Sequence, residues 1–123
     1  MAIQIKRIYD SVQESDGLRL LVDRLWPRGV SKEAARLDGW TKELTPSSQL
    51  RTWFGHKAEN FPEFAALYRA ELDASAEAQA TVRDIILQSK EGTVTLLYGA
   101  RDPQINHAII LKEYLEEKSK GIV

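Results

Sequence analysis

Residues 93–102 read Thr-Val-Thr-Leu-Leu-Tyr-Gly-Ala-Arg-Asp, and they carry the strongest signal of fold in the chain. The first six are β-branched or large and apolar, which is the composition of a buried strand. Gly99 and Ala100 then break the pattern, and Asp102 with Pro103 is typical of a helix start, because Asp caps free backbone N–H groups and Pro fits the first turn. The stretch predicts a strand over 93–98 and a helix from 103 to about 118.

Two further strands are predicted near the start of the chain. Residues 3–8 begin with alternating apolar and polar side chains, which indicates a strand with one covered face. Residues 18–22 are more continuously apolar and indicate a strand buried on both faces. The segment between them is short for a parallel crossover, so the sequence leaves the relative direction of these two strands open.

Helical spacing of apolar residues accounts for most of the middle of the chain. Ser31 is expected to cap a short helix that ends near residues 38–39. Further helices are expected from Pro46 to Gly55, after Pro62, and from about 76 to 88. Strands near both ends with helices between and after them predict one small three-layer α/β domain over residues 1–123, with a short, mostly parallel sheet flanked by helices.

Composition excludes several classes of protein. The chain has no cysteine, so disulfides, thiolate metal sites and cysteine nucleophiles are all excluded. No apolar run approaches the ~20 residues that span a bilayer, and we expect a cytoplasmic protein without a membrane partner. The net charge of −1 argues against a general nucleic-acid-binding surface. The two histidines have no metal-ligand spacing, so no metal is expected, and no motif identifies a cofactor.

Candidate site residues gather after the three predicted strands. In a parallel α/β sheet, ligands bind beyond the carboxyl ends of the strands, where helix N-termini add free N–H groups. If the three strand ends converge, arginines would hold a phosphate or carboxylate and aromatic rings would contact a flat group. The candidates are Arg7 and Tyr9 after the first strand; Asp23, Arg24, Trp26 and Arg28 after the second; Tyr98, Asp102 and Asn106 after the last; and Trp53.

Each candidate also has an ordinary structural explanation. Asp23 and Arg24 could form an ion pair at the sheet end, and Asp102 could simply cap a helix. Tryptophans are common in cores and at their rims. Arg28 is harder to explain in this way, since Pro27 and Gly29 hold it on a turn. Residues 51–56 interleave cations and aromatics, as stacking sites do, but an amphipathic helix with a solvated edge has the same pattern.

The leading hypothesis is therefore a protein that binds a small anionic, phosphate- or nucleotide-like ligand. In this hypothesis Arg7, Arg24 and Arg28 hold the anion, Trp26 or Trp53 stacks on the ligand, and Asp23 or Asp102 acts as the acid/base if the protein is an enzyme. A nucleic-acid-binding or regulatory protein and a protein-interaction module that uses the tryptophans remain alternatives. The oligomeric state is left open.

Nearly the whole chain resembles the YeaO-like branch of the bacterial domain-of-unknown-function family 488. The resemblance is carried by 7–10, 21–29, Lys32, 38–40, 46–47, 50–51, 53–56, Phe64, Tyr68, 71–72, 94–100, Asp102 and Asn106. It implies a compact α/β fold in which the second and last strand ends are the most family-typical parts.

The wider family looks as if it has a Cys at the position of Tyr98 and a Cys-His-Arg triplet where this chain has Asn106, His107 and Ala108. Only the histidine of that triplet is present here. Any thiol chemistry of the wider family is therefore not expected of this chain.

Overall fold

The computed structural model describes residues 2–121, and its framework is a four-stranded sheet in which every pairing is parallel. The strands lie in the order β1-β4-β2-β3. Their bounds are β1 Ala2–Arg7, β2 Leu18–Leu21, β3 Gly39–Trp40 and β4 Thr93–Tyr98. The last long strand therefore lies between the two strands near the start of the chain. Because β1 and β2 both pair with β4 in parallel, they also run parallel to one another, which answers the question that the short connection had left open.

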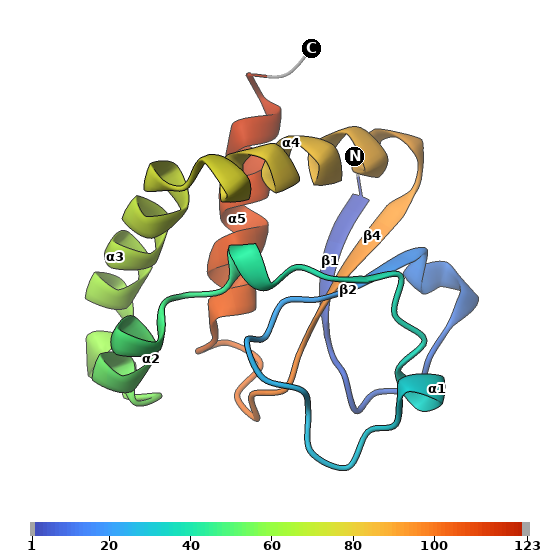
Figure 1. The fold of residues 1–123 in the computed structure, drawn as a ribbon, viewed down its shortest axis with the longest axis horizontal. Coiled ribbons are helices and arrows are strands. Elements are labelled where there is room, and N and C mark those ends of the chain that lie inside the picture. The colour runs from blue at the N-terminus through green and yellow to red at the C-terminus, as the bar shows by residue number, and fades with distance from the viewer. Residues whose placement is uncertain (1, 122–123) are drawn as a thin grey trace.

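Five α-helices surround this sheet within the described part of the chain. They are α1 Lys32–Ala35, α2 Ser48–Phe54, α3 Phe61–Ala74, α4 Ala76–Glu91 and α5 His107–Ser119, with short 3-10 helices at Glu14–Asp16, Lys42–Leu44 and Ala58–Asn60. Figure 1 shows α3, α4 and α5 together beside the strands, with α2 next to the start of α3. The predicted small α/β fold with a parallel sheet flanked by helices is confirmed.

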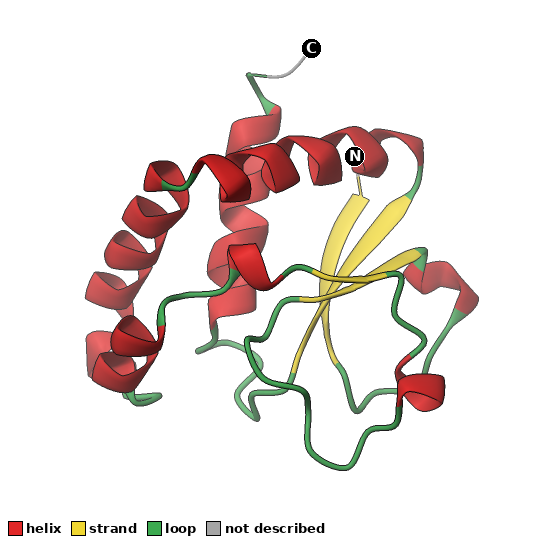
Figure 2. Cartoon of the chain, in the orientation of Figure 1, coloured by secondary structure: helices red, strands yellow, loops and turns green. Residues whose placement is uncertain are grey.

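Apolar side chains pack on both faces of the sheet. The larger core joins Leu20, Val94 and Leu96 to the apolar sides of α2–α5. The smaller one joins Ile8, Leu21 and Leu97 to α1 and to the loops on either side of it. Figure 2 shows why the two cores differ in size: long helices cover one side of the strands, whereas the segment between β2 and α2 is mainly loop.

Three predicted helix ends are corrected by the structure, each by about one turn. Helix α1 ends at Ala35 rather than near residue 38, because Arg36 adopts a left-handed backbone with φ 47°. Helix α4 continues to Glu91, about one turn beyond the expected end. Helix α5 begins at His107 rather than at residue 103. Asn106 has an extended backbone, so the helix cannot include it, and the side chain of Asn106 caps the helix.

A buried ion cluster ties the β1–β2 connection to the sheet. The Asp16 carboxylate accepts hydrogen bonds from the Nζ of Lys6 at 2.9 Å and the Nη1 of Arg19 at 2.5 Å. The Arg19 guanidinium also donates to the carbonyl of Ala35, which anchors the end of α1. A connection too short for a helical crossover is thus held by charge-assisted hydrogen bonds rather than by a packed helix.

None of the helices in the described range is both long and apolar enough to cross a membrane.

Candidate functional site

A pocket of about 670 Å³ opens beyond the carboxyl ends of β2 and β4. Its floor contains Gly99 and Ala100 after β4 together with Asn106 and His107 at the start of α5. The loop after β2 contributes a second part of the lining, and α2, the segment that follows its end and Phe64 of α3 contribute a third. The volume is in the range of pockets that bind small molecules. Figure 1 shows the loops at these strand ends and the start of α5 together in the lower part of the view.

Six of the ten residues proposed from the sequence line this pocket. They are Tyr9, Asp23, Arg24, Trp26, Arg28 and Asn106. The strand ends on which these residues were placed therefore lie around one cavity. The remaining four, Arg7, Trp53, Tyr98 and Asp102, are not among its lining residues.

Arg7 lies behind the pocket rather than in it. Its guanidinium donates from Nε to the Ala100 carbonyl at 2.9 Å and from Nη2 to the Gly99 carbonyl at 3.4 Å. The same group lies 4.9 Å from the ring centroid of Tyr9. Arg7 thus fixes the turn after β4 and supports Tyr9, and these contacts occupy donors that the sequence hypothesis had reserved for an anion.

The other three residues outside the pocket also have structural surroundings. Tyr98 is buried in the larger core. The Asp102 carboxylate accepts from the backbone N–H groups of Gln104 and Ile105, so it caps a turn ahead of α5 instead of α5 itself. Trp53 lies on the exposed side of α2.

Asp23 and Arg24 do not pair with each other. The guanidinium of Arg24 donates to the Pro46 carbonyl from Nε at 3.3 Å and from Nη2 at 3.2 Å. The Asp23 carboxylate accepts from the backbone N–H of Gly99 at 2.8 Å and faces His107. The two adjacent side chains therefore connect the end of β2 to three different segments: the loop before α2, the end of β4 and the start of α5.

The tryptophan of the loop after β2 supports the wall of the pocket. The rings of Trp26 and Trp40 meet edge to face with centroids 5.4 Å apart. The Trp26 Nε1–H donates to the Val30 carbonyl, and the Trp40 Nε1–H donates to the Asp23 carbonyl, each at 2.6 Å. Both indole donors are therefore occupied by backbone, which holds this wall in shape and leaves ring surface as the part that a ligand could contact.

His107 and Asp23 form a pair at the floor of the pocket. Nε2 of His107 lies 2.8 Å from the Val22 carbonyl and 3.3 Å from Asp23 Oδ1. Since both neighbours are acceptors, Nε2 carries the hydrogen. Burial lowers the pKa of His107 below its usual 6.5, against the attraction of Asp23. Burial likewise raises the pKa of Asp23 above 3.8, against the influence of His107 and the Gly99 N–H. Both shifts favour the uncharged forms of the pair.

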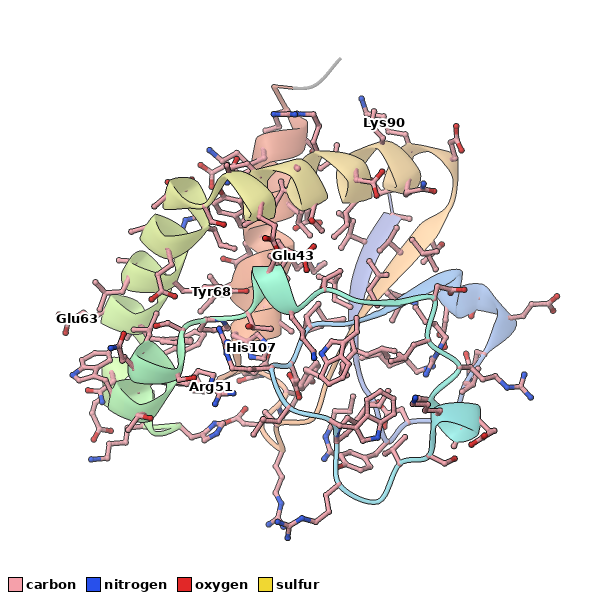
Figure 3. All side chains as sticks on the ribbon, in the orientation of Figure 1. Glu43, Arg51, Glu63, Tyr68, Lys90 and His107 are labelled. Atoms are coloured by element: carbon pink, nitrogen blue, oxygen red, sulfur yellow. The ribbon has the colours of Figure 1, made fainter. Side chains whose placement is uncertain are left out.

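Arg51 is a pocket residue that the sequence hypothesis did not select. It comes from α2, and its charge acts on both Asp23 and His107. Its Nε is buried and has no hydrogen-bond partner in the described structure. Figure 3 shows Arg51 and His107 next to each other, with Tyr68 on the side of α3. The pattern of residues 51–56 did mark this segment, but only the fold brings α2 against the strand ends.

Helix α2 is held at its first turn by α3. The Glu71 carboxylate accepts from the Ser47 backbone N–H at 2.8 Å and from its hydroxyl at 2.6 Å. The Ser47 hydroxyl oxygen in turn accepts from the Leu50 N–H and caps the helix. Together with the hydrogen bonds from Arg24 to the Pro46 carbonyl, this arrangement fixes the position from which Arg51 reaches the pocket.

Among residues 2–121, no three His, Asp or Glu side chains cluster in a way that could hold a metal ion.

Comparison with known proteins places the chain in a family. The family model described as the inactive DUF488-N3 subclade matches residues 2–121. The chain belongs to the DUF488-N3 family. Within its relatives, the uncharacterised protein YeaO of Escherichia coli strain K12 is 44% identical over 115 residues, which cover 94% of this chain and 97% of that protein. The uncharacterised protein Rv3073c of Mycobacterium tuberculosis strain H37Rv is 38% identical over 113 residues, 92% of each chain.

These matches confirm the resemblance to the YeaO-like branch of the family. Both relatives are described as uncharacterised, so they add no ligand or activity to the DUF488-N3 assignment. No solved structure matches the chain.

Proposed function

We propose that this protein binds a small anionic ligand in the strand-end pocket. The observation that carries the proposal is the charge of the lining: Arg24, Arg28 and Arg51 stand against one carboxylate, that of Asp23. Arg51 is the most telling of the three, because its buried Nε lacks a hydrogen-bond partner within residues 2–121. A buried guanidinium donor without a partner costs stability, which is typical of a residue kept for binding, and oxyanions are the groups with which guanidinium side chains pair best.

The start of α5 supports the same proposal. Helix α5 has 13 residues, and its first residue, with the cap Asn106, lies at the pocket floor. A helix of this length carries partial positive charge at its N-terminus, which adds to the field of the arginines. Arg28 is the third arginine of the lining and comes from the loop after β2. Its carbonyl is fixed by the hydroxyl of Tyr9 at 3.0 Å, while its side chain is exposed.

Binding without chemical turnover fits the composition of the site. The matched subclade is described as inactive, and the chain has no cysteine with which to form a thiolate. Of the two aspartates considered as acid/base groups, Asp102 caps a turn outside the pocket. Asp23 is held by the Gly99 N–H and His107, an arrangement suited to positioning a ligand. The proposal is therefore an anion-binding protein rather than a hydrolase or transferase.

The proposal is tested by a thermal-shift and calorimetric screen of the purified protein. The probes are inorganic phosphate, sulfate, nucleoside monophosphates, sugar phosphates and dicarboxylates. A ligand at 100 times its dissociation constant should stabilise the fold by about 2.7 kcal/mol, a shift of several degrees for a chain of this size. Arg28→Ala and Arg51→Met should each abolish this shift, because each removes a cation from the pocket lining.

Arg83→Ala is the matched control, since it removes an arginine from the exposed side of α4, away from the pocket. It should bind the same probe with the affinity of the original protein. Absence of any anion binding across the screen would refute the proposal. If the Arg28 and Arg51 variants bound the anion with the affinity of the original protein, the anion would lie elsewhere.

A further inference from the structure

Asp23 is a carboxylate in a pocket that is otherwise lined by cations and neutral groups. It is the single acid among the described residues that line the pocket, and its side chain is 21% exposed. A bound anion would therefore meet a negative group as well as the arginines. Such a carboxylate costs affinity for an anion unless the ligand brings a hydrogen for it to accept.

The hydrogen bonds around Asp23 leave this acceptor capacity open. Oδ2 accepts from the Gly99 N–H at 2.8 Å. Oδ1 lies 3.3 Å from Nε2 of His107, but that nitrogen is closer to the Val22 carbonyl, at 2.8 Å. A neutral imidazole with its hydrogen on Nε2 has one donor there, and the nearer carbonyl takes the larger share of it.

The remaining neighbours do not satisfy Oδ1. Arg51 acts on Asp23 through its charge, and no hydrogen bond joins the two in the described structure. Each carboxylate oxygen accepts about two hydrogen bonds when fully satisfied, so Oδ1 has room for a strong donor. A donor that reaches it from the pocket must come from the ligand or from water.

We infer that the pocket selects oxyanions that carry a hydrogen-bond donor of their own, as hydrogen phosphate and phosphorylated sugars do, over oxyanions of equal shape and charge that carry none. The inference rests on the proposed anion binding and narrows its ligand class. The arginines attract both kinds of anion, and Asp23 distinguishes them, because it accepts a hydrogen from the first and repels the oxygens of the second.

The expected discrimination is large for so small a chemical difference. Closed sites built around a substrate hydroxyl or N–H reject analogues without it by about 10⁴-fold or more, because a buried polar group is left unpaired. This pocket is partly open to solvent, and Asp23 is partly exposed. We therefore expect a preference of about 100-fold, since water can partly replace the missing donor.

Inorganic phosphate and sulfate are the decisive pair of probes. At pH 8 phosphate is mainly a dianion with one hydrogen, whereas sulfate is a dianion of similar shape with none. Isothermal titration calorimetry at constant ionic strength should give a dissociation constant about 100-fold lower for phosphate than for sulfate. Asp23→Asn should bring the two constants within a few-fold of each other, mainly by improving sulfate binding, because the amide can donate to an anion oxygen.

Asp84→Asn is the matched control for the loss of one negative charge, as Asp84 lies on the exposed side of α4. It should keep the preference of the original protein. In Asp23→Asn the amide oxygen of the new side chain can still accept from the Gly99 N–H, so this variant should fold, and circular dichroism checks this directly.

Equal affinity for phosphate and sulfate would overturn the inference and leave the anion site standing. Failure of both simple anions to bind, while a larger anion of the screen does, would overturn it as well. A preference for phosphate that persists in Asp23→Asn would show that another group makes the distinction. Failure of every anion in the screen would refute the proposed function itself.

Discussion

Oδ1 of Asp23 lies 3.3 Å from Nε2 of His107, and this contact joins the end of β2 to the first residue of α5. Nε2 also reaches the Val22 carbonyl at 2.8 Å. One imidazole therefore bridges the backbone and the side chain of two successive residues at the strand end. The T-shaped contact of its ring with Tyr68, with centroids 6.2 Å apart, extends the connection to α3.

The first prediction concerns the pH dependence of stability. Burial lowers the pKa of His107 below its usual 6.5. The unfolded chain then takes up a proton near pH 6.5 while the folded chain does not, so the free energy of unfolding should fall as the pH drops below 6.5. For one proton the slope cannot exceed about 1.4 kcal/mol per pH unit. Urea unfolding between about pH 7.5 and pH 5.5 measures it.

His107→Gln is the informative variant, because its amide can still donate to the Val22 carbonyl but cannot take up a proton. Its free energy of unfolding should depend less on pH across this window. Asp23 contributes with the opposite sign, since its raised pKa adds stability at low pH that is lost as the pH rises through the folded value. Identical slopes in the original and the His107 variant would contradict the prediction.

The second prediction concerns the buried ion cluster. Burial alone would raise the pKa of Asp16, but hydrogen bonds from Lys6, the Gln13 N–H and Arg19 hold it below 3.8. The stability that this shift provides is present above pH 3.8 and is lost as the pH falls through the lower folded value. Asp16→Asn should cost about 3–5 kcal/mol at pH 7, because it leaves the guanidinium of Arg19 buried without its counter-charge.

Glu117→Gln is the comparison for a surface pair, as Glu117 meets Arg69 with its side chain largely exposed. It should cost less than about 1 kcal/mol. Chemical denaturation of both variants measures their free energies of unfolding. Similar losses of stability in the two variants would contradict the prediction that the buried cluster contributes more than the surface pair.

The third prediction uses two glycines that share a positive φ. Gly17 has φ +62° and Gly29 has φ +79°. A Cβ on Gly17 would overlap the carbonyl oxygen of Thr93, whereas a Cβ on Gly29 would have nothing within 4 Å. Gly29→Ala should therefore cost about 1–2 kcal/mol, from backbone strain alone. Gly17→Ala should cost more than about 4 kcal/mol, because the strand β4 must also move. Urea unfolding measures the loss of stability in each variant. Equal losses would mean that β4 moves away from the added Cβ at little cost in free energy.

The sequence predicted the framework of the fold because strand and helix signals are local. Residues 93–98 are a strand with the predicted bounds, and apolar periodicity located α3 and α4. The order of the strands, in contrast, is not set by local signals. Placing β4 between β1 and β2 depends on contacts between residues about ninety positions apart, such as Ile3 with Val94, and no local pattern encodes that pairing.

The start of α5 shows why local signals fail when two of them compete. Asp102 and Asn106 are both cap-forming residues, and the sequence favoured the first because Pro103 follows it. In the structure each side chain caps a different turn: Asp102 accepts from Gln104 and Ile105, and Asn106 accepts from Ile109. Asn106 also donates to the Asp102 carbonyl, which joins the two turns. Only this geometry identifies the true helix start.

Among the site residues, the sequence found side chains at strand ends but not the roles of the arginines. The hypothesis gave Arg7 and Arg24 the same anion-holding role as Arg28, yet their guanidinium groups are used by backbone carbonyls. Arg51 had no strand end to mark it. It reaches the pocket because α2 lies against the strand ends, an arrangement set by Glu71 on Ser47 far along the chain.

The last prediction separates an arginine kept for binding from one kept for structure. The Nε of Arg51 is buried without a hydrogen-bond partner in the described structure, and an unsatisfied buried donor costs about 1–3 kcal/mol. Met has a similar unbranched side chain without that donor. Arg51→Met should therefore leave the free energy of unfolding of the unliganded protein unchanged or raise it by about 1 kcal/mol, the attraction to Asp23 offsetting part of the gain. Arg24→Met, which loses two hydrogen bonds to the Pro46 carbonyl, should lower it by about 1–3 kcal/mol. Denaturant titrations without ligand, followed by calorimetry with phosphate, give both quantities for each variant. A less stable Arg51→Met protein that still binds phosphate would assign this arginine to the scaffold and remove the main support for the anion site.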